Sequence, residues 1–376
     1  MFLALMLAAA SAVVVPFTIL ANHLVIPVTI DGKPAHALFD TGGGNSVDRQ
    51  FADRLVLKVT SRGRAAGAGE ATVPSAETRV RTLQFGSIVM HDQSFTILPL
   101  ARSLTNGNDV QVDAIVGREI LHRYVARIDY DAQTIAFTPS GEFKYEGSGE
   151  SIPLENRHGA AVVRASIEGL GGTFQIDTGS SASLILTSPF VQAHGLRALD
   201  RPVGNMIVGR GVGGYTRADI AAGKRFRIGN VVLDDVLVEL SSDRRGAFAS
   251  RYIDGNIGND VLRRMTLTLD EPHHVAYLER NSRTDVPTPP NRAGLYAQND
   301  DREFFAVVDV LADGPAYQAG LRTGDRIVAI DGTPSAGVTA DDFWNLLHGP
   351  PGKTLSFTVD RDGKTRAVSV TLRNIE

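Results

Sequence analysis

The chain has 376 residues, of which 43% are hydrophobic and 21% charged, and its net charge is −4. This length predicts two or three domains, and the composition is typical of folded globular proteins and not of disordered chains. The slightly acidic balance argues against a basic nucleic-acid-binding surface. Because the chain has no cysteine, disulfides, thiol catalysis and thiolate zinc sites are excluded.

The amino-terminal segment resembles an export signal. It carries no charged side chain, and Phe2–Ala10 is an apolar run followed by small residues, although no Lys or Arg precedes that run. We therefore predict a signal peptide at residues 1–12 and a periplasmic or secreted protein. Two alternatives stay open. Residues 1–20 are almost long enough to anchor the protein in a membrane, and Val13–Leu20 is equally compatible with a strand of the folded body.

The sequence contains two copies of one domain-sized unit. Ala37–Gly43 reads ALFDTGG and Thr173–Ser180 reads TFQIDTGS, which places two Asp-Thr-Gly motifs 137 residues apart. A second pair of similar segments, Asp113–Leu121 and Asp254–Leu262, recurs at an interval of 141 residues. The nearly constant interval predicts two lobes of one fold, residues 13–140 and 141–283, packed about a pseudo-twofold axis.

Each lobe is predicted to consist mainly of strands. In the first, Leu24–Ile30 and Ala35–Phe39 flank an Asp-Gly turn. In the second, Ala161–Ile167 and Thr173–Ile176 flank a glycine-rich turn. We expect a short helix after each Asp-Thr-Gly motif, the second with Ser188 as its N-cap ahead of a proline. The predicted fold class is all-β.

A single Asp-Thr-Gly motif is usually a turn, but a duplicated one has a chemical reading. The symmetry would bring Asp40 and Asp177 together at the axis between the lobes. Two carboxyls a few Å apart share one proton, so one can act as base and the other as acid on a water molecule. The residues expected to support this dyad are Thr41, Gly42, Thr178, Gly179 and Ser180.

This arrangement resembles the bacterial retropepsin-like aspartic proteases that carry both lobes in one chain. The resemblance implies that Asp40 and Asp177 are catalytic and that Thr41 and Thr178 interlock between the lobes. It also implies an apolar-apolar-Gly element, which is Ile115-Val116-Gly117 in lobe one.

The second lobe departs from the first at two positions. Asn256 stands where lobe one has the apolar Ile115, and Ser180 follows the second Asp-Thr-Gly where lobe one has Gly43. Gly43 has no hydroxyl to offer. We therefore expect the Ser180 hydroxyl to bond Asp177 and favour its ionised form, which leaves the shared proton on the first aspartate.

Each lobe also has a glycine-rich stretch between its two motifs, Gly67–Gly69 and Gly209–Gly214. The family resemblance implies mobile flaps that close over the substrate. The flap and substrate-binding residues would be Gly67, Gly69, Gly211 and Gly213. Plain hairpin turns are the alternative, whereas a phosphate-binding loop is disfavoured because no Lys-Ser/Thr follows either stretch.

Other chemistry finds little support in the sequence. His273 and His274 are adjacent and have no Glu at a metal-binding spacing, so we expect a solvated surface pair. There is no Gly-x-Ser-x-Gly nucleophile motif. A glycosidase also uses two carboxylates, but an aromatic content of 7% with one Trp suits sugar stacking poorly.

A proline-containing linker at residues 284–292 precedes a third domain, residues 293–376. Gly314–Gly332 reads GPAYQAGLRTGDRIVAIDG and resembles a bacterial PDZ domain. In that family a peptide adds as a strand beside a groove helix, which would be Thr339–Leu347. The loop expected to hold a peptide carboxylate is Gly294, Leu295 and Tyr296. The alternative is a PDZ fold that serves only as a docking brace.

The sequence therefore predicts an exported two-lobe aspartic endopeptidase with a PDZ domain. We expect protein or peptide substrates, a peptide ligand at the PDZ groove, no metal or organic cofactor and no nucleic-acid partner, with membrane contact only through an uncleaved N-terminus. The rival hypothesis is a catalytically inactive peptide-binding protein, which Gly43 and Asn256 favour. A separation beyond about 5 Å between the Asp40 and Asp177 carboxyls would favour the rival, because the two groups could not then bond one water.

Overall fold

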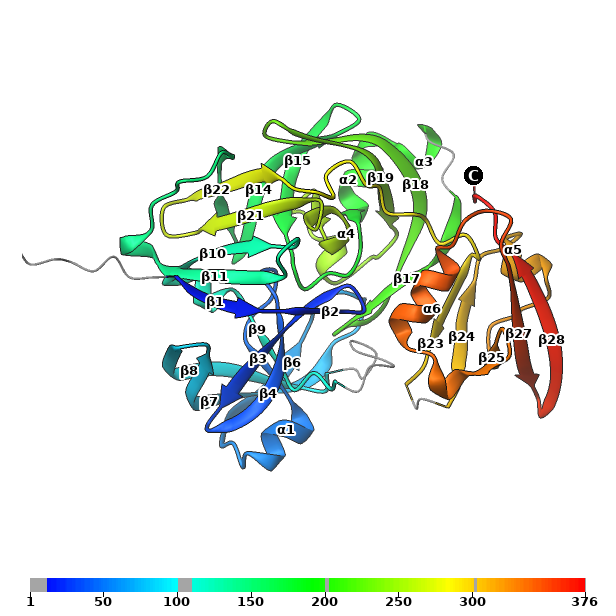
Figure 1. The fold of residues 1–376 in the computed structure, drawn as a ribbon, viewed down its shortest axis with the longest axis horizontal. Helices are drawn as coiled ribbons and strands as arrows, with labels where there is room; N and C mark the ends of the chain where they lie inside the picture. The colour runs from blue at the N-terminus through cyan, green and yellow to red at the C-terminus, as the bar shows by residue number, and fades with distance from the viewer. Residues whose placement is uncertain (1–11, 101–109, 200–202, 301–302, 376) are drawn as a thin grey trace, which may run out of the picture.

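A computed structural model describes residues 12–100, 110–199, 203–300 and 303–375. Its strands form four sheets, one for each lobe, one between the lobes and one in the PDZ region (Figure 1). The fold is thus mostly β, as predicted. Apart from Ala12, the predicted signal peptide lies outside the described residues. None of the helices in the described part of the chain has the length and apolar character needed to span a membrane.

Lobe one is built on an eight-stranded sheet. Its hairpin of β3 and β4 forms where the sequence predicts it, with the turn residue Asp31 at positive φ. The strands in sheet order are β2 (Thr18–Leu20), β3 (His23–Ile30), β4 (Lys33–Phe39), β9 (Ala114–Val116), β5 (Ser46–Asp48), β8 (Ile88–Leu98), β7 (Val73–Phe85) and β6 (Val59–Ala65). The short helices are α1 (Arg49–Arg54) and η2 (Arg118–His122).

Lobe two has a sheet with the same order of equivalent strands. In both sheets the second strand also pairs with the seventh, β3 with β7 in lobe one and β14 with β18 in lobe two. The strands are β13 (Glu155–Arg157), β14 (Ala160–Ile167), β15 (Leu170–Ile176), β20 (Gly255–Ile257), β16 (Leu184–Leu186), β19 (Val231–Ser241), β18 (Gly214–Ile228) and β17 (Val203–Gly211). The helices are α2 (Ser188–His194), α3 (Leu196–Leu199), η4 (Ala247–Ala249) and α4 (Asn259–Leu262). Thr187, not Ser188, is the N-cap of α2, so the predicted cap is wrong by one residue.

A six-stranded sheet joins the lobes, and β10 of lobe one pairs directly with β21 of lobe two. Its order is β1 (Val13–Pro16), β11 (Thr134–Pro139), β10 (Tyr124–Asp129), β21 (Met265–Asp270), β22 (Val275–Arg280) and β12 (Glu150–Pro153), with η3 (Ser140–Glu142) after β11. Val13–Leu20 is therefore part of two strands, β1 and β2, as the strand alternative proposed. A membrane anchor spanning residues 1–20 does not fit these strands.

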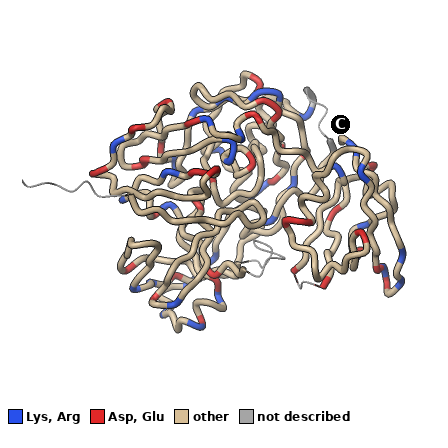
Figure 2. The backbone as a smooth tube through the Cα atoms, in the orientation of Figure 1, with Lys and Arg blue, Asp and Glu red and all other residues tan. Residues whose placement is uncertain are grey.

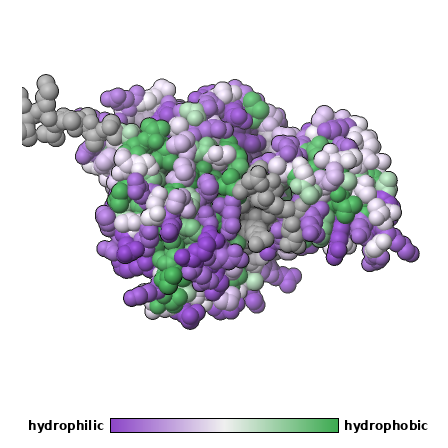
Figure 3. Space-filling view, turned by 60° about the horizontal axis from the view of Figure 1, so that its bottom comes forward, coloured by the Kyte–Doolittle hydropathy of each residue, from purple (hydrophilic) through white to green (hydrophobic). Residues whose placement is uncertain are grey.

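One hydrophobic core runs through both lobes and the sheet between them, from Val15 to Leu278. The PDZ region has a separate core that extends from Ala293 to Leu372. Charged residues of both signs are scattered over the described backbone (Figure 2). On the face drawn in Figure 3, hydrophobic residues form small groups among hydrophilic ones. The molecule is thus two cores joined by the segment from residue 284 to 292.

The PDZ sheet has the order β23 (Leu295–Gln298), β24 (Phe305–Val310), β25 (Arg326–Ile330), β27 (Thr354–Arg361) and β28 (Lys364–Thr371), and β26 (Thr333–Pro334) pairs with β25. Its helices are α5 (Pro315–Gln318), η5 (Ser335–Gly337) and α6 (Ala340–Leu347). The Thr339 hydroxyl accepts a bond from the Asp342 N–H and caps α6, the predicted groove helix. β23 forms one edge of this sheet.

Candidate active site

Asp40 and Asp177 lie at equivalent points of the two lobes, each directly after a strand that pairs in parallel with the second motif of its lobe. The Asp40 N–H bonds the Val116 carbonyl at 2.9 Å, and the Asp177 N–H bonds the Ile257 carbonyl at 3.1 Å. These backbone bonds fix the start of each loop. The pairing of β4 with β9 and of β15 with β20 explains why the two sequence motifs recur together.

The threonines of the two loops interlock at the lobe interface. The Thr41 hydroxyl donates to the Ile176 carbonyl at 2.9 Å, and the Thr178 hydroxyl donates to the Phe39 carbonyl at 2.7 Å. Each hydroxyl also accepts the backbone N–H of the other threonine, at 3.0 and 3.1 Å. Both side chains are fully buried, so these four bonds satisfy them and fix one loop against the other.

The interlock brings the two carboxyls together. Asp40 and Asp177 are both partly buried, and the charge of Asp177 acts directly on Asp40. Gly42 lies against the Asp177 carboxyl and Gly179 against the Asp40 carboxyl, so a Cβ at either glycine would overlap the opposite aspartate. Glycine is required at both positions by this close approach. Each carboxyl therefore reaches across to the Asp-Thr-Gly loop of the other lobe.

Burial and mutual repulsion make the two carboxyls unequal. The pKa of Asp40 is raised to about 8, first by desolvation and then by the negative charge of Asp177. Two backbone N–H groups, of Gly42 and Gly43, each donate to Asp40 at 2.8 Å and offset part of this rise. The pKa of Asp177 is raised by burial, but several hydrogen bonds lower it. These surroundings favour protonation of Asp40 over protonation of Asp177.

Asn256 is the main source of this asymmetry. Its side-chain N–H donates to Asp177 Oδ2 at 2.7 Å, while the Gly179 N–H donates to Oδ1 at 2.9 Å. Ser180 contributes through its backbone N–H, and its hydroxyl accepts a bond from the Ala182 N–H instead. The sequence hypothesis therefore named the wrong side chain as donor to Asp177.

Gln175 adds a second polar side chain on the lobe-two side of the site. Gln175 is the cross-strand partner of Asn256, and its side chain donates to the Gly42 carbonyl of the other lobe at 3.0 Å. The equivalent pair in lobe one is Leu38 and Ile115, both buried in an apolar cluster. These surroundings favour the charged carboxylate of Asp177 in lobe two and disfavour the charged carboxylate of Asp40 in lobe one.

The glycine-rich stretches lie at the tips of equivalent hairpins, β6–β7 and β17–β18, and the two tips touch. The Gly213 N–H donates to the Ala68 carbonyl at 2.7 Å, and the Ala71 N–H donates to the Gly213 carbonyl at 2.9 Å. A Cβ at Gly69 or Gly211 would overlap the opposite tip. A Cβ at Gly67 would lie 3.2 Å from the Val212 Cβ. Both predicted flap tips are therefore in contact, and Gly67 also bonds Ala247 from the loop before β20.

Several residues of the site were not found from the sequence. Asn259 bridges the Thr178 carbonyl and the Asn22 carbonyl, at 2.8 Å each, and accepts the hydroxyl of Tyr130. The Asn22 side chain in turn bonds Asp260 at 2.9 Å. The only sequence signal is the position of Asn259 directly after the second Gly of the repeated motif. Its partners come from three distant segments, which no local pattern brings together.

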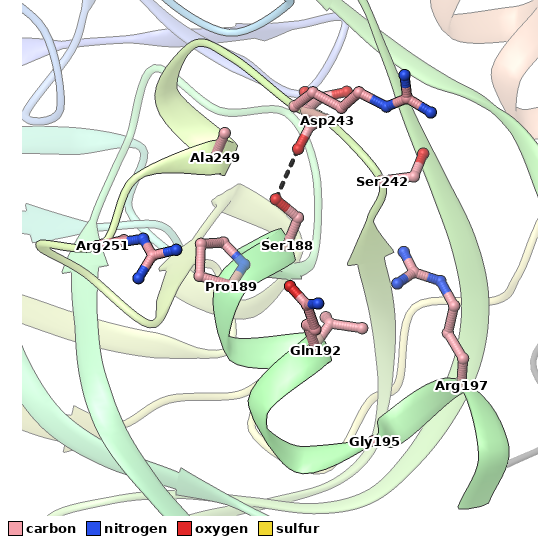
Figure 4. Close-up of a pocket in the computed structure, with 11 residues that line it drawn as sticks. Ser188, Pro189, Gln192, Gly195, Arg197, Ser242, Asp243, Ala249 and Arg251 are labelled. Carbon is pink, nitrogen blue, oxygen red and sulfur yellow. Dashed lines mark hydrogen bonds between the residues drawn. The ribbon is translucent and has the colours of Figure 1, made fainter.

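A cavity of about 660 Å³ lies beside α2 in lobe two (Figure 4). Its lining includes Ser188, whose hydroxyl donates to the Asp243 carbonyl at 2.6 Å, and the arginines Arg197, Arg244 and Arg251. No residue of the two Asp-Thr-Gly motifs lines it, so it is separate from the dyad. Among the described residues, no group of three His, Asp or Glu side chains is placed to hold a metal ion.

The expected carboxylate loop of the PDZ domain is engaged by its own chain. The N–H groups of Ala293 and Gly294 both donate to the Asn291 side-chain oxygen at 3.1 Å. Leu295 is buried in the PDZ core. The ring of Tyr296 packs edge-on against Tyr215 of lobe two at a centroid distance of 6.2 Å. Each of the three predicted groove residues already has a partner in the protein. Gly294 bonds Asn291 of its own loop, Leu295 packs in the PDZ core, and Tyr296 packs against lobe two.

Comparison with known proteins agrees with this architecture. Residues 26–120 match the family model of aspartyl proteases, and residues 294–372 match that of PDZ domains. The chain carries an aspartyl protease lobe followed by a PDZ domain. The protease match covers most of lobe one, including Asp40, and the PDZ match covers the sheet from β23 to β28. The chain thus has the domain organisation of a PDZ-containing protease.

Curated relatives are proteases of other catalytic classes. The zinc metalloprotease RasP of Geobacillus kaustophilus is 36% identical over 17% of this chain and 14% of its own length. A carboxy-terminal-processing protease of Bartonella bacilliformis is 27% identical over 31% of this chain and 27% of its own. A probable periplasmic DegP-like serine endoprotease of Ectopseudomonas mendocina is 39% identical over 19% and 15%. The chain therefore spans only a small part of these relatives.

Proposed function

We propose that this protein is an aspartic endopeptidase in which Asp177 is the general base and Asp40 carries the proton. The observation that supports it most is the close approach of two partly buried carboxyls on symmetry-related loops, each packed against a glycine of the opposite loop. Burying two acidic groups against each other is unfavourable for folding unless one stays protonated. A protein that only binds peptides has no physical need for this arrangement.

The geometry suggests a simple mechanism. A water molecule between the carboxyls gives one proton to Asp177, and its oxygen attacks the peptide carbonyl carbon. Asp40 gives its proton to the carbonyl oxygen, which produces a neutral tetrahedral diol. As the C–N bond breaks, the proton on Asp177 passes to the leaving nitrogen and a diol proton returns to Asp40. The dyad ends with one proton, as it began.

The closed flaps favour polypeptide substrates in an extended form. The tips of β6–β7 and β17–β18 join through backbone groups, and a flap that opens and closes excludes water from a reaction. Extended chains offer N–H and C=O groups that such strands can bond along their length. The curated relatives include a probable periplasmic endoprotease, and we propose an exported location for this protein as well.

The rival hypothesis of an inactive binder loses part of its sequence support. Asn256 looked like a defect in the family pattern, yet its amide donates to the carboxylate that must be ionised. Gly43 lacks a hydroxyl, yet its N–H donates to Asp40 at 2.8 Å. Both departures therefore supply hydrogen bonds that an active dyad can use.

The test is digestion of an unfolded protein between mildly acidic and neutral pH by the wild type and by Asp177→Asn. We expect wild-type cleavage and a loss of about 10²–10⁴-fold in the variant, because the base is removed while the shape is kept. Asp92→Asn is the matched control, since Asp92 is exposed on strand β8 at φ 53°, where Asn is well tolerated. No cleavage by folded wild type over this range would support the binder.

A further inference from the structure

The groove of the PDZ domain is closed by the flap of lobe two. The cavity between β23 and α6 is lined on its PDZ side by Leu295, Phe343 and Trp344. Its other walls are formed by Met206 and Ile207 of β17, the outer strand of the second flap hairpin, and by residues 21–23 and 181–182 of the lobes. Figure 1 shows β17 lying beside α6 and β23. One strand thus serves both the flap and the far wall of the groove.

Specific polar contacts hold β17 in this position. The Ile207 N–H donates to Asp309 of β24 at 2.8 Å, and Arg217 of β18 pairs with the same carboxylate at 3.0 Å. The Tyr215 hydroxyl donates to Gln298 at 3.0 Å. Met206 and Ile207 are only 2% and 5% exposed. The contact between flap and PDZ domain is therefore a defined interface with a polar clamp at Asp309.

The groove suits an internal segment of a chain better than a free carboxyl end. Asn291 already occupies the N–H groups of Ala293 and Gly294, and Gly294 is one of the residues predicted to hold a peptide carboxylate. The edge of β23 that faces away from β24 has no strand paired with it in the described sheets. An extended segment with aliphatic side chains fits such an edge beside the apolar face of α6.

The cavity is too small for that segment as it stands. Its volume is about 230 Å³, below the roughly 300–1,000 Å³ of typical ligand pockets. Phe343 and Leu295 belong to the PDZ core and resist displacement. By contrast, β17 is an edge strand whose pairing with β18 is interrupted by two register shifts. The wall that gives way is therefore β17.

We propose that an extended segment of a partner polypeptide, carrying aliphatic side chains, binds between β23 and α6, displaces β17 and thereby opens the flaps. β17 ends at Gly211, next to Gly213, whose backbone makes both bonds to the flap tip of lobe one. Moving the strand strains these bonds, so groove occupancy and flap closure oppose each other. The inference rests on the proposed function only where it concerns turnover; the coupling itself does not require catalysis.

The first experiment measures groove binding in the full-length chain. Trp344 is the one tryptophan of the sequence and lines the groove, so its fluorescence reports occupancy. The probe is a synthetic peptide of residues 203–211, VGNMIVGRG, which has the aliphatic side chains of β17 and no tryptophan. It is added to Asp177→Asn protein to prevent cleavage. We expect a saturable change in emission, and a peptide with Ser in place of Met206, Ile207 and Val208 should give none. Equal responses, or no response to either peptide, would overturn the proposed site.

The second experiment measures the coupling by hydrogen exchange at the flap tips. Asp309→Ala removes the clamp, and we expect the Gly213 and Ala71 amides to exchange about tenfold faster without any peptide, since bonds to a charged group are lost. The wild-type probe peptide should accelerate the same amides. Asp360→Ala on β27, away from the groove, is the matched control. Unchanged exchange in Asp309→Ala, or peptide binding without faster exchange, would overturn the coupling.

Turnover separates this inference from the proposed function. If the protein is a peptidase, Asp309→Ala and the probe peptide should each raise the cleavage rate of an unfolded substrate at low substrate concentration. A protein that never cleaves but shows the expected exchange response would refute the peptidase and retain the coupling. If the enzyme is active but Asp309→Ala changes neither the exchange of the tip amides nor the cleavage rate, the proposed peptidase function stands and the coupling is refuted.

Discussion

The donor on Asp177 is the residue that distinguishes the two halves of the dyad. Asn256 donates to this carboxylate, whereas its counterpart Ile115 lies in an apolar cluster beside β4. A hydrogen bond to the charged form lowers a carboxyl pKa, and apolar surroundings raise it. The two lobes have the same fold, so this one exchange of amide for aliphatic side chain decides which aspartate ionises.

Replacing Asn256 by Leu should move the acidic limb of activity to higher pH. Asp177 must be ionised to act as base, and losing the donor raises its pKa, so activity is lost earlier as pH falls. We expect a shift of about one to two pH units, because a bond to a charged group contributes about 1.5–3 kcal/mol and 1.36 kcal/mol equals one unit. The measurement is the pH dependence of kcat/KM.

Ser180→Ala is the control for this shift. Its contribution to Asp177 comes from the backbone N–H, which alanine keeps, so the acidic limb should stay in place. A shift in Ser180→Ala with none in Asn256→Leu would restore the serine hypothesis and refute the role of the amide. On the alkaline side, the pKa of Asp40 near 8 sets the expected loss of the acid form in both variants.

At the scale of elements, the two flap hairpins explain why glycine is concentrated at 67–69 and 211–214. The tips approach so closely that Cβ atoms at Gly69 and Gly213 would overlap the opposite backbone. Glycine is therefore required at these positions because the two hairpins touch, and neither hairpin alone would require it. If the protein is a peptidase, we expect this contact between the tips to open before a polypeptide substrate can enter.

A disulfide between the tips should switch this step off. Gly67→Cys with Val212→Cys places two Cβ atoms about 3.2 Å apart, close to the separation in disulfides. The chain has no other cysteine, so oxidation is unambiguous. We expect cleavage of an unfolded protein to fall at least about tenfold on oxidation and to recover with reductant. Each single variant should ignore the oxidant, and an oxidised double variant with undiminished activity would show that the flaps need not separate.

For the whole molecule, the arrangement of cores divides the chain differently from its three predicted domains. Both lobes share one core and one sheet, in which β10 pairs with β21. The PDZ domain has its own core. A shared core makes the two lobes unfold together, whereas a separate core permits independent unfolding.

Calorimetry should therefore show two cooperative transitions, one for the paired lobes and one for the PDZ domain. Phe357→Ala, at a fully buried position of the PDZ core, should lower that transition alone, at a cost of about 3–5 kcal/mol. Leu267→Ala in β21 should lower the other transition by about 2–5 kcal/mol. Separate transitions for the two lobes would contradict the shared core.

The repeated motifs and their interval were enough to predict the duplication, the all-β fold, the interlocking threonines and the aspartate pair. These features follow from local strand and turn patterns and from symmetry, which one-dimensional spacing records. The short helix cap at Ser188 was predicted one residue late, which is the ordinary uncertainty of helix ends.

The tertiary structure decided which side chain donates to Asp177, that the flap tips touch, that Val13–Leu20 joins two sheets, and that β17 closes the PDZ groove. Asn256 read in isolation looked like a defect, because its partner lies 79 residues away. Asn259, Asn22 and Asp309 carry no local pattern, since their partners come from other lobes or domains. Hydrogen bonds between distant segments depend on packing in three dimensions, and a linear pattern holds no record of it.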